Sequence, residues 1–275
     1  MSRAASAGTA RLLLLLDSPA LRPFTFMGGE YRVQVLGWEA LITAARHAPP
    51  SAAVLADGFT SREPGPDPRL EQLLQAAPSL PVLVAFDLAT AQAPGVRLLA
   101  DLGVSDFVDL PIEHNPSSLL VRLQATHARP FKRRLDKGLQ DISPHALTLV
   151  TGAAGVVADG GLSSDLAREF GVSERTLLGW CTRTGLPSPQ RLLAWQRVLL
   201  AVALLEEPWR TVQDTARAVG YTDDSTFRRA AAALLGHRLH RGDPPFDAAL
   251  ASFRAELKNA YLVREPPRPA PRGAG

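Results

Sequence analysis

Short apolar runs alternate with amphipathic stretches through the first half of the chain. Five such runs predict β-strands, and they cover residues 11–16, 32–36, 52–56, 81–85 and 106–108. Helical periodicity between the runs predicts helices over residues 38–47, 70–77, 91–102 and 117–126. Apolar strands that alternate with helices indicate a parallel sheet covered on both faces. We therefore expect a doubly wound α/β domain over residues 9–126.

The pattern changes in the second half to two helix-turn-helix units joined by one long helix. The first unit reads LSSDLAREFGVSERTLLGWCTRTG, and the second reads TVQDTARAVGYTDDSTFRRAAAALLG. Each has a turn opened by a glycine and a second helix that we expect a hydroxyl residue, Ser173 or Thr222, to cap. Between the units, no helix breaker occurs from Pro189 to Pro208. An all-α domain with a tandem helix-turn-helix is therefore predicted over residues 142–241.

The second helix of each unit has one apolar face and one polar face. In the second unit, Phe227, Ala231 and Leu234 recur at helical spacing and are expected to face inward. Hydroxyl and guanidinium groups on the opposite faces are those that base edges and phosphates require. The candidate DNA-contacting residues of the two units are Arg175, Thr176, Thr182, Arg183, Ser225, Thr226, Arg228 and Arg229. A joining helix of about 18 residues spans roughly 27 Å, close to one duplex turn of about 34 Å, so the units suit two adjacent major grooves.

Three segments carry a resemblance to a known family: LAREFGVSERTL, SPQRLLAWQRV and ARAVGYTDDSTFRR. With them, the second half resembles the DNA-binding domain of AraC-type transcription regulators. The resemblance implies double-stranded DNA as the partner, contacts by both recognition helices, and action near RNA polymerase. The family commonly has arginine at Gly179 and Phe-Lys near Ala231 and Ala232. We therefore expect the first unit to bind DNA weakly and to serve more for positioning than for base readout.

The first half resembles the receiver domain of two-component response regulators through LLLLD, WEAL, AAVLAD and GVSDFVDLP. The resemblance implies Asp57 as the candidate phosphoryl acceptor. Phosphoryl transfer also needs a metal-binding acidic pair, a hydroxyl and a lysine. Here the acidic pair is reduced to Asp17 followed by Ser18, Phe86 takes the hydroxyl position, and Leu110 takes the lysine position. We expect a degenerate receiver that acts independently of phosphorylation.

Receiver-like folds often pair through their last helix-strand-helix face, here about residues 92–126. The first half is therefore expected to form a homodimer or to dock a partner protein. Residues 127–141 are expected to be a linker. An amphipathic helix is predicted over residues 243–263, with Phe246, Leu250, Phe253, Leu257 and Tyr261 at helical spacing. Residues 264–275 are proline-rich and are expected to be disordered.

Charge and composition restrict the function further. The formal net charge is +3 for 275 residues, and residues 120–275 have 22 basic and 15 acidic side chains, whereas residues 1–119 have 8 and 12. The basic half is the one with the helix-turn-helix units, as a DNA partner requires. Cys181, the only cysteine, is expected in the core, and no metal-binding motif occurs.

Several function classes have no sequence support. No nucleophile, base and orienting group can be combined, so neither an enzyme nor a cofactor is expected. No segment approaches the roughly 20 apolar residues that a membrane span needs, and we expect a cytoplasmic protein. Two interpretations stay open: a sequence-specific DNA-binding regulator, and a protein-docking adaptor with weakened DNA binding.

Overall fold

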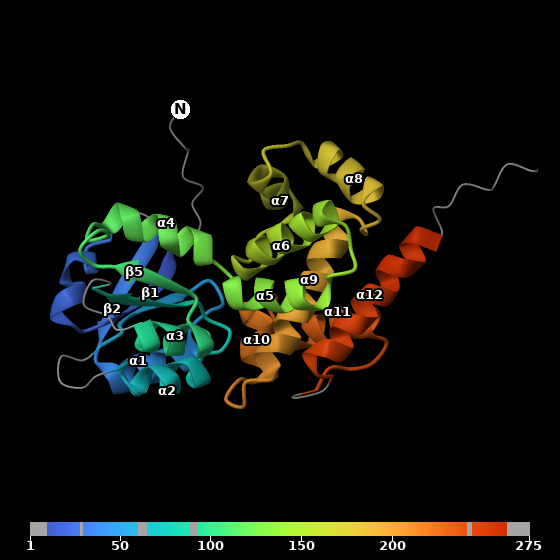
Figure 1. The fold of residues 1–275 in the computed structure, drawn as a ribbon. Coiled ribbons are helices and arrows are strands. Elements are labelled where there is room, and N and C mark those ends of the chain that lie inside the picture. The colour runs from blue at the N-terminus through green and yellow to red at the C-terminus, as the bar shows by residue number, and fades with distance from the viewer. Residues whose placement is uncertain (1–9, 28–29, 60–64, 88–92, 241–243, 263–275) are drawn as a thin grey trace, which may run out of the picture. The chain divides into compact units, whose positions relative to one another are not determined.

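The computed structural model describes residues 10–27, 30–59, 65–87, 93–240 and 244–262 (Figure 1). The chain forms two compact units. The first comprises Met1–Arg133 with Glu207–Arg210, and the second comprises Arg134–Glu206 with Thr211–Gly275.

A sheet of five parallel strands forms the centre of the first unit. The strands are β1 (Arg11–Leu16), β2 (Tyr31–Leu36), β3 (Ala53–Asp57), β4 (Val82–Phe86) and β5 (Asp106–Asp109). Their order is β2-β1-β3-β4-β5, which is that of the flavodoxin-like doubly wound folds. Leu13, Leu14 and Leu15 of the inner strand β1 are completely buried, because helices cover both faces of the sheet. The predicted α/β fold is confirmed.

Helices cover this sheet on both faces. They are the 3-10 helix η1 (Pro19–Phe24), α1 (Trp38–His47), α2 (Arg69–Ala76), α3 (Ala93–Asp101) and α4 (Pro116–Thr126). Figure 1 shows α4 on one face and α1, α2 and α3 on the other. The first helix of the fold is reduced to η1, with Pro23 inside it and Leu21 and Phe24 buried against the sheet.

Helix α5 (Arg129–Gly138) lies within the segment that the sequence predicts as a linker. Phe131, Leu135 and Leu139 are buried at intervals of four residues. This periodicity is that of an amphipathic helix, and the many basic residues around it hide the signal. The boundary between the two units falls inside α5.

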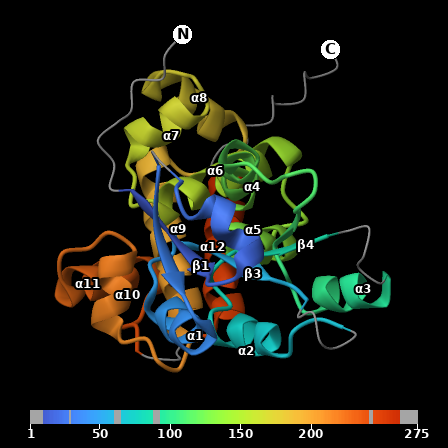
Figure 2. The same cartoon turned by 90° about the vertical axis from the view of Figure 1, so that its left-hand side faces the viewer.

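The second unit is helical throughout its described part. Its further helices are α6 (Pro144–Ala158), α7 (Ser163–Glu169), α8 (Glu174–Arg183), α9 (Pro189–Leu205), α10 (Val212–Ala218), α11 (Asp224–Leu235) and α12 (Phe246–Leu262). Figures 1 and 2 show α7 and α8 near one end of α9, and α10 and α11 near the other. Helix α9 packs against each of these helices and against α6 and α12. It is the central element of the unit.

The predicted C-terminal amphipathic helix corresponds to α12. Phe246, Leu250, Phe253 and Leu257 are buried along one side of it, whereas the Tyr261 side chain lies outside the described part, as does the tail over residues 264–275. Within the described residues, no helix combines the length and hydropathy needed to cross a membrane. The same residues contain no cluster of three or more side chains suited to metal binding.

Candidate nucleic-acid interface

The first helix-turn-helix unit consists of α7, a glycine turn and α8. Gly171 has a φ of +66°, which glycine adopts without steric cost. Ser173 caps α8, since its Oγ accepts a hydrogen bond from the Thr176 backbone N–H at 3.1 Å. Leu177 and Cys181 of α8 are completely buried. The cap that the sequence predicts is confirmed, and Cys181 is a buried core thiol, as expected.

The side of α8 opposite this core faces solvent. Arg175, Thr176, Thr182 and Arg183 are all exposed, and Leu178 is 48% exposed beside them. Helix α8 thus presents two guanidinium groups and two hydroxyl groups away from the core. These are the side-chain types that contact base edges and phosphates.

The second unit repeats this layout with α10, a glycine turn and α11. Thr211 caps α10 by accepting from the Asp214 backbone N–H at 3.1 Å. Gly220 opens the turn with a φ of +88°. In α11, Phe227 and Ala231 are completely buried, and the Phe227 ring packs against Tyr221 at 5.4 Å between ring centroids. Two of the three predicted inward residues are thus in the core.

The remaining predictions for α11 need correction. Leu234 is only half-buried and is the second-to-last residue of α11. Thr222 does not cap α11. Asp223 does, with its Oδ1 accepting from the Thr226 backbone N–H at 2.7 Å, and a carboxylate at this position also interacts favourably with the helix dipole. Asp is itself a preferred capping residue, so the sequence also allows a cap at Asp223.

Asp223 also binds the hydroxyl groups that the sequence predicts as DNA contacts. Ser225 Oγ donates to its Oδ1 at 2.6 Å, and Thr226 Oγ1 donates to its Oδ2 at 2.9 Å. The hydrogen bond from Ser225, followed by those from Thr226, lowers the pKa of Asp223 well below its usual value. The carboxylate is therefore ionised at neutral pH, and a negative charge lies beside both hydroxyl groups.

The two arginines of α11 also have partners within the unit. Arg228 forms an ion pair with Asp224, with 3.3 Å between nitrogen and oxygen. Arg229 is exposed, and its Nη2 donates to Thr226 Oγ1 at 3.3 Å. Ser225, Thr226 and Arg229 are thus joined in one network around Asp223, and Arg228 pairs separately with Asp224. Exposed pairs of this kind are weak, so DNA can replace them.

Contacts with α12 hold α9 in place. Trp195 Nε1 donates to Glu256 Oε2 at 2.7 Å, and Arg191 Nη2 donates to the same oxygen at 2.8 Å. The Trp195 and Phe253 rings lie 5.5 Å apart between centroids. Trp195 is the largest completely buried side chain, and its burial contributes much of the apolar packing between α9 and α12. Sequence spacing offers no signal for these contacts, because they join residues about 60 positions apart.

Comparison with known proteins identifies the domain. A family model described as a helix-turn-helix domain matches residues 166–241, which include both helix-turn-helix units. Residues 166–241 form an AraC-type helix-turn-helix domain. The chain thus joins an α/β unit with a receiver-like fold to a helical unit that contains this helix-turn-helix domain.

Comparisons over the whole chain are weaker. No curated protein matches it. Among solved structures, full-length FixJ from B. japonicum is similar with a TM-score of 0.36 and 17% identity, over 69% of this chain and 95% of that one. The xylose-binding transcription activator xylR is similar with a TM-score of 0.32 and 12% identity, over 88% of this chain and 70% of that one. The description of the receiver-like domain rests instead on its strand order.

In the first unit, the receiver resemblance implies a site around Asp57. Asp57 ends β3, where its Oδ2 accepts from Ser18 Oγ at 2.8 Å and its Oδ1 accepts from the Phe59 backbone N–H at 3.3 Å. Phe86, which the receiver resemblance places at the family's hydroxyl position, ends β4. Its ring packs edge-on against Phe59 and Phe107 at centroid distances of 5.3 and 5.6 Å. Phe59, Phe86 and Phe107 thus form an aromatic cluster.

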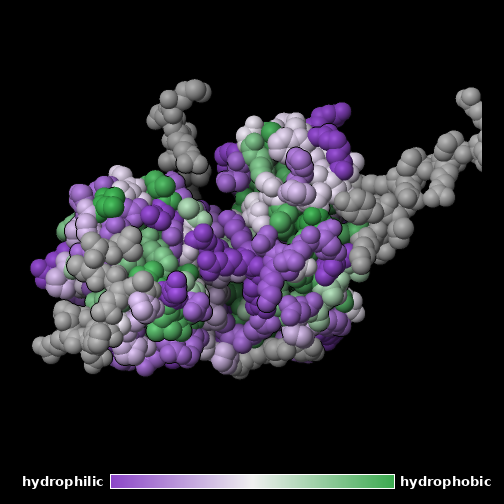
Figure 3. All heavy atoms as spheres, viewed as in Figure 1, coloured by the Kyte–Doolittle hydropathy of each residue, from purple (hydrophilic) through white to green (hydrophobic). Residues whose placement is uncertain are grey.

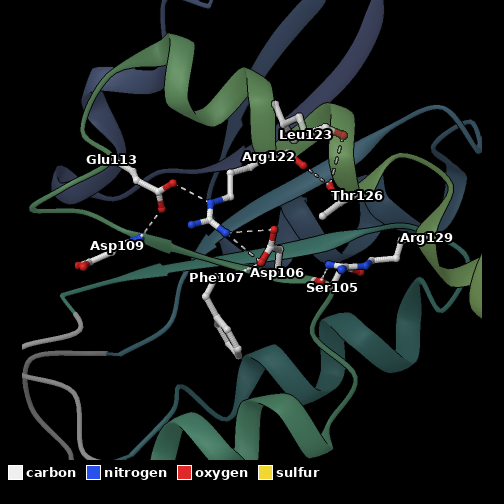
Figure 4. A network of polar contacts seen from close by, with 9 residues as sticks. All are labelled: Ser105, Asp106, Phe107, Asp109, Glu113, Arg122, Leu123, Thr126 and Arg129. Carbon is white, nitrogen blue, oxygen red and sulfur yellow. Dashed lines mark hydrogen bonds and ion pairs between the residues drawn. The ribbon is translucent and has the colours of Figure 1, made fainter.

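Figure 4 shows a second polar network, between β5 and α4. Arg122 Nε donates to Glu113 Oε1 at 2.7 Å, and Arg122 Nη1 lies 3.3 Å from Asp106 Oδ1. Glu113 Oε2 also accepts from the Asp109 backbone N–H at 3.1 Å. Burial alone would raise the pKa of Glu113, but the hydrogen bonds from Arg122 and Asp109 lower it overall. The sequence carries no signal for this network, which joins α4 to β5.

Apolar side chains are exposed on α3, on α4 and in the turn before α4. Ile112 is 72% exposed, Val121 on α4 is 66% exposed, and Leu98 on α3 is 49% exposed. Figure 3 shows hydrophobic side chains over α4. Large exposed apolar side chains are candidates for an interaction surface. Ile112, Val121 and Leu98 are called the α3–α4 patch below.

Proposed function

We propose that this regulator binds DNA sequence-specifically by placing α8 and α11 in two adjacent major grooves of one duplex. The observation that carries the proposal is the length of α9, to which both helix-turn-helix units are attached. Its 17 residues span about 26 Å, and successive major-groove sites on one side of a duplex lie about 34 Å apart. Double-stranded DNA near a site of RNA polymerase action is thus the proposed ligand. The role requires no catalysis and is consistent with the cytoplasmic location expected from the sequence.

The rigidity of α9 supports this arrangement. Trp195, Leu199 and Val202 are buried along its length, and the hydrogen bonds to Glu256 fix its first half. A buried helix with partners on several sides does not bend freely. The separation of the two recognition helices is therefore set by the fold before DNA binds.

A docking adaptor is the second candidate, because acidic partners occupy Ser225, Thr226 and Arg228 in α11. Measuring binding to genomic fragments over a series of salt concentrations separates the two functions. A DNA-binding regulator prefers certain fragments, and its log affinity falls linearly with log salt by about 0.9 per phosphate contact. An adaptor shows neither a preferred fragment nor a steep slope.

We expect regulation without phosphorylation of Asp57. Incubation with acetyl phosphate and Mg²⁺ should give no stable acid-labile label, because Phe86 and Leu110 stand where a hydroxyl and a lysine would neutralise the phosphoryl oxygens. Asp57→Asn should change DNA affinity by less than about fivefold, the lower end of typical allosteric coupling. Mass spectrometry and a binding titration check the two expectations. Stoichiometric label on Asp57, with altered DNA affinity, would contradict them.

The α3–α4 patch is proposed as the contact between two copies of the chain. Val121→Asp should convert the dimer to a monomer in sedimentation experiments. The contact would otherwise bury the new carboxylate without a partner, which is costly. Ala40→Asp is the matched control, since Ala40 is exposed on α1 outside the patch. A monomeric wild-type chain, or a dimer that survives Val121→Asp, would refute this contact.

A further inference from the structure

Helix α8 has a row of residues four positions apart along its exposed side. Arg175, Gly179 and Arg183 follow one another at successive helical turns. Leu177 and Cys181, which are completely buried, mark the opposite side. Gly179 therefore lies near the middle of the face that would enter the groove, between two guanidinium groups.

Neither the backbone nor the packing requires a glycine at position 179. Gly179 lies inside α8 without a positive φ, and glycine costs about 0.5–1 kcal/mol relative to alanine inside a helix. A Cβ built on Gly179 would meet only one atom within 4 Å, Nη1 of Arg183 at 3.4 Å. The Arg183 side chain thus folds back by one turn, and its guanidinium lies over the bare backbone.

The arginines of α8 differ from those of α11 in their partners. Within the described part of the chain, neither Arg175 nor Arg183 has a hydrogen bond or an ion pair. Arg228, by contrast, pairs with Asp224, and Arg229 donates to Thr226. The α8 guanidinium groups can therefore bind DNA without first releasing an internal partner.

We propose that Arg183, lying over Gly179, supplies the guanidinium with which α8 reads a guanine, so that the first recognition helix contributes more base discrimination than the second. An arginine can donate two hydrogen bonds to O6 and N7 of guanine in the major groove. The bare turn at Gly179 leaves room for this guanidinium and for close approach of the helix to the base edges. The inference rests on the proposed function, and it reverses the weak role that the missing arginine at position 179 suggests from sequence alone.

The test uses the full-length chain and DNA fragments that it selects from a random-sequence pool. Arg183→Ala should lower affinity for the selected fragment by about 5- to 150-fold and remove the preference for guanine at one base pair. Arg229→Ala should weaken binding similarly on all fragments, as loss of a phosphate contact does. The matched control is Arg168→Ala on α7, since Arg168 is exposed and already paired with Asp165. It should leave the base preference unchanged.

Substitutions at Gly179 test the geometry directly. Gly179→Leu should remove the same guanine preference although Arg183 is retained, because the new side chain fills the space over which the guanidinium lies. Gly179→Arg combined with Arg183→Ala should restore the preference, because a guanidinium again lies over this turn. Thermal unfolding followed by circular dichroism verifies that each variant is folded.

Two outcomes overturn the inference, and they are distinguishable. If Arg183→Ala keeps the base preference while Arg229→Ala removes it, the second recognition helix dominates and the regulator function stands. If the wild-type chain selects no sequence at all, the proposed function fails and the inference fails with it.

Discussion

Replacing Phe227 by alanine is expected to destabilise the AraC-type domain by about 3–5 kcal/mol and to abolish DNA binding. The Phe227 ring is completely buried and contacts Tyr221 in the turn before α11. Its removal leaves a cavity beneath the recognition helix and frees that turn. The orientation of α11 would be lost with the packing that sets it.

Hydrogen exchange of amides in α9 and α11 measures the loss of stability in the helical domain separately from the α/β domain. Such a probe is needed because a chain with two units does not unfold in one step. Phe227→Leu is the control, since it keeps an apolar side chain in the site and should retain DNA binding. Unchanged protection of α11 in Phe227→Ala, together with lost DNA binding, would mean that Phe227 acts as a contact and not as part of the core.

Phe86→Thr is expected to destabilise the receiver-like domain by about 3–5 kcal/mol. The substitution introduces the hydroxyl residue type that the receiver family has at this position. Phe86 is only 4% exposed, and its ring contacts Phe59 and Phe107 edge-on. Threonine would lose these contacts and bury a hydroxyl group, which adds a desolvation cost unless it finds a partner.

The matched control is Phe26→Thr, because Phe26 is 90% exposed in the same domain. It should change stability by no more than about 0.5 kcal/mol. Urea denaturation, followed by hydrogen exchange of amides in β3 and β4, compares the two variants. A Phe86→Thr chain as stable as the wild type, and labelled on Asp57 by acetyl phosphate, would show that the pocket is still a working receiver site.

Local patterns in the sequence predict the elements of both units well. The apolar runs that become β1, β3 and β4 are short and continuous, and strands of this kind are buried in parallel sheets. Glycine turns and helix caps are likewise local, so the positions of α8 and α11 follow from the sequence. The sequence predicts Thr222 as the cap of α11 in place of Asp223, because both are good capping residues.

Contacts between distant residues could not be predicted in this way. Nothing in the sequence indicates that Glu256 accepts from Trp195, since 61 residues separate them. The same holds for the aromatic cluster around Phe86, where three rings from different elements meet. In the interface, side-chain type indicated the candidates, but only the structure shows that Asp223 binds the Ser225 hydroxyl while Arg183 has no partner in the described chain. Which candidates are available for DNA is therefore a property of the fold.

The most direct test of the central claim is a hydroxyl-radical footprint on a selected DNA fragment, followed by an insertion into that fragment. Protected backbone sugars beside two major-groove segments on one side of the duplex, about 10 base pairs apart, are expected because α9 holds α8 and α11 at a fixed separation. Inserting half a turn, about 5 base pairs, between the segments should reduce binding to the level of unrelated DNA. One protected segment, or full affinity after the insertion, would contradict the account.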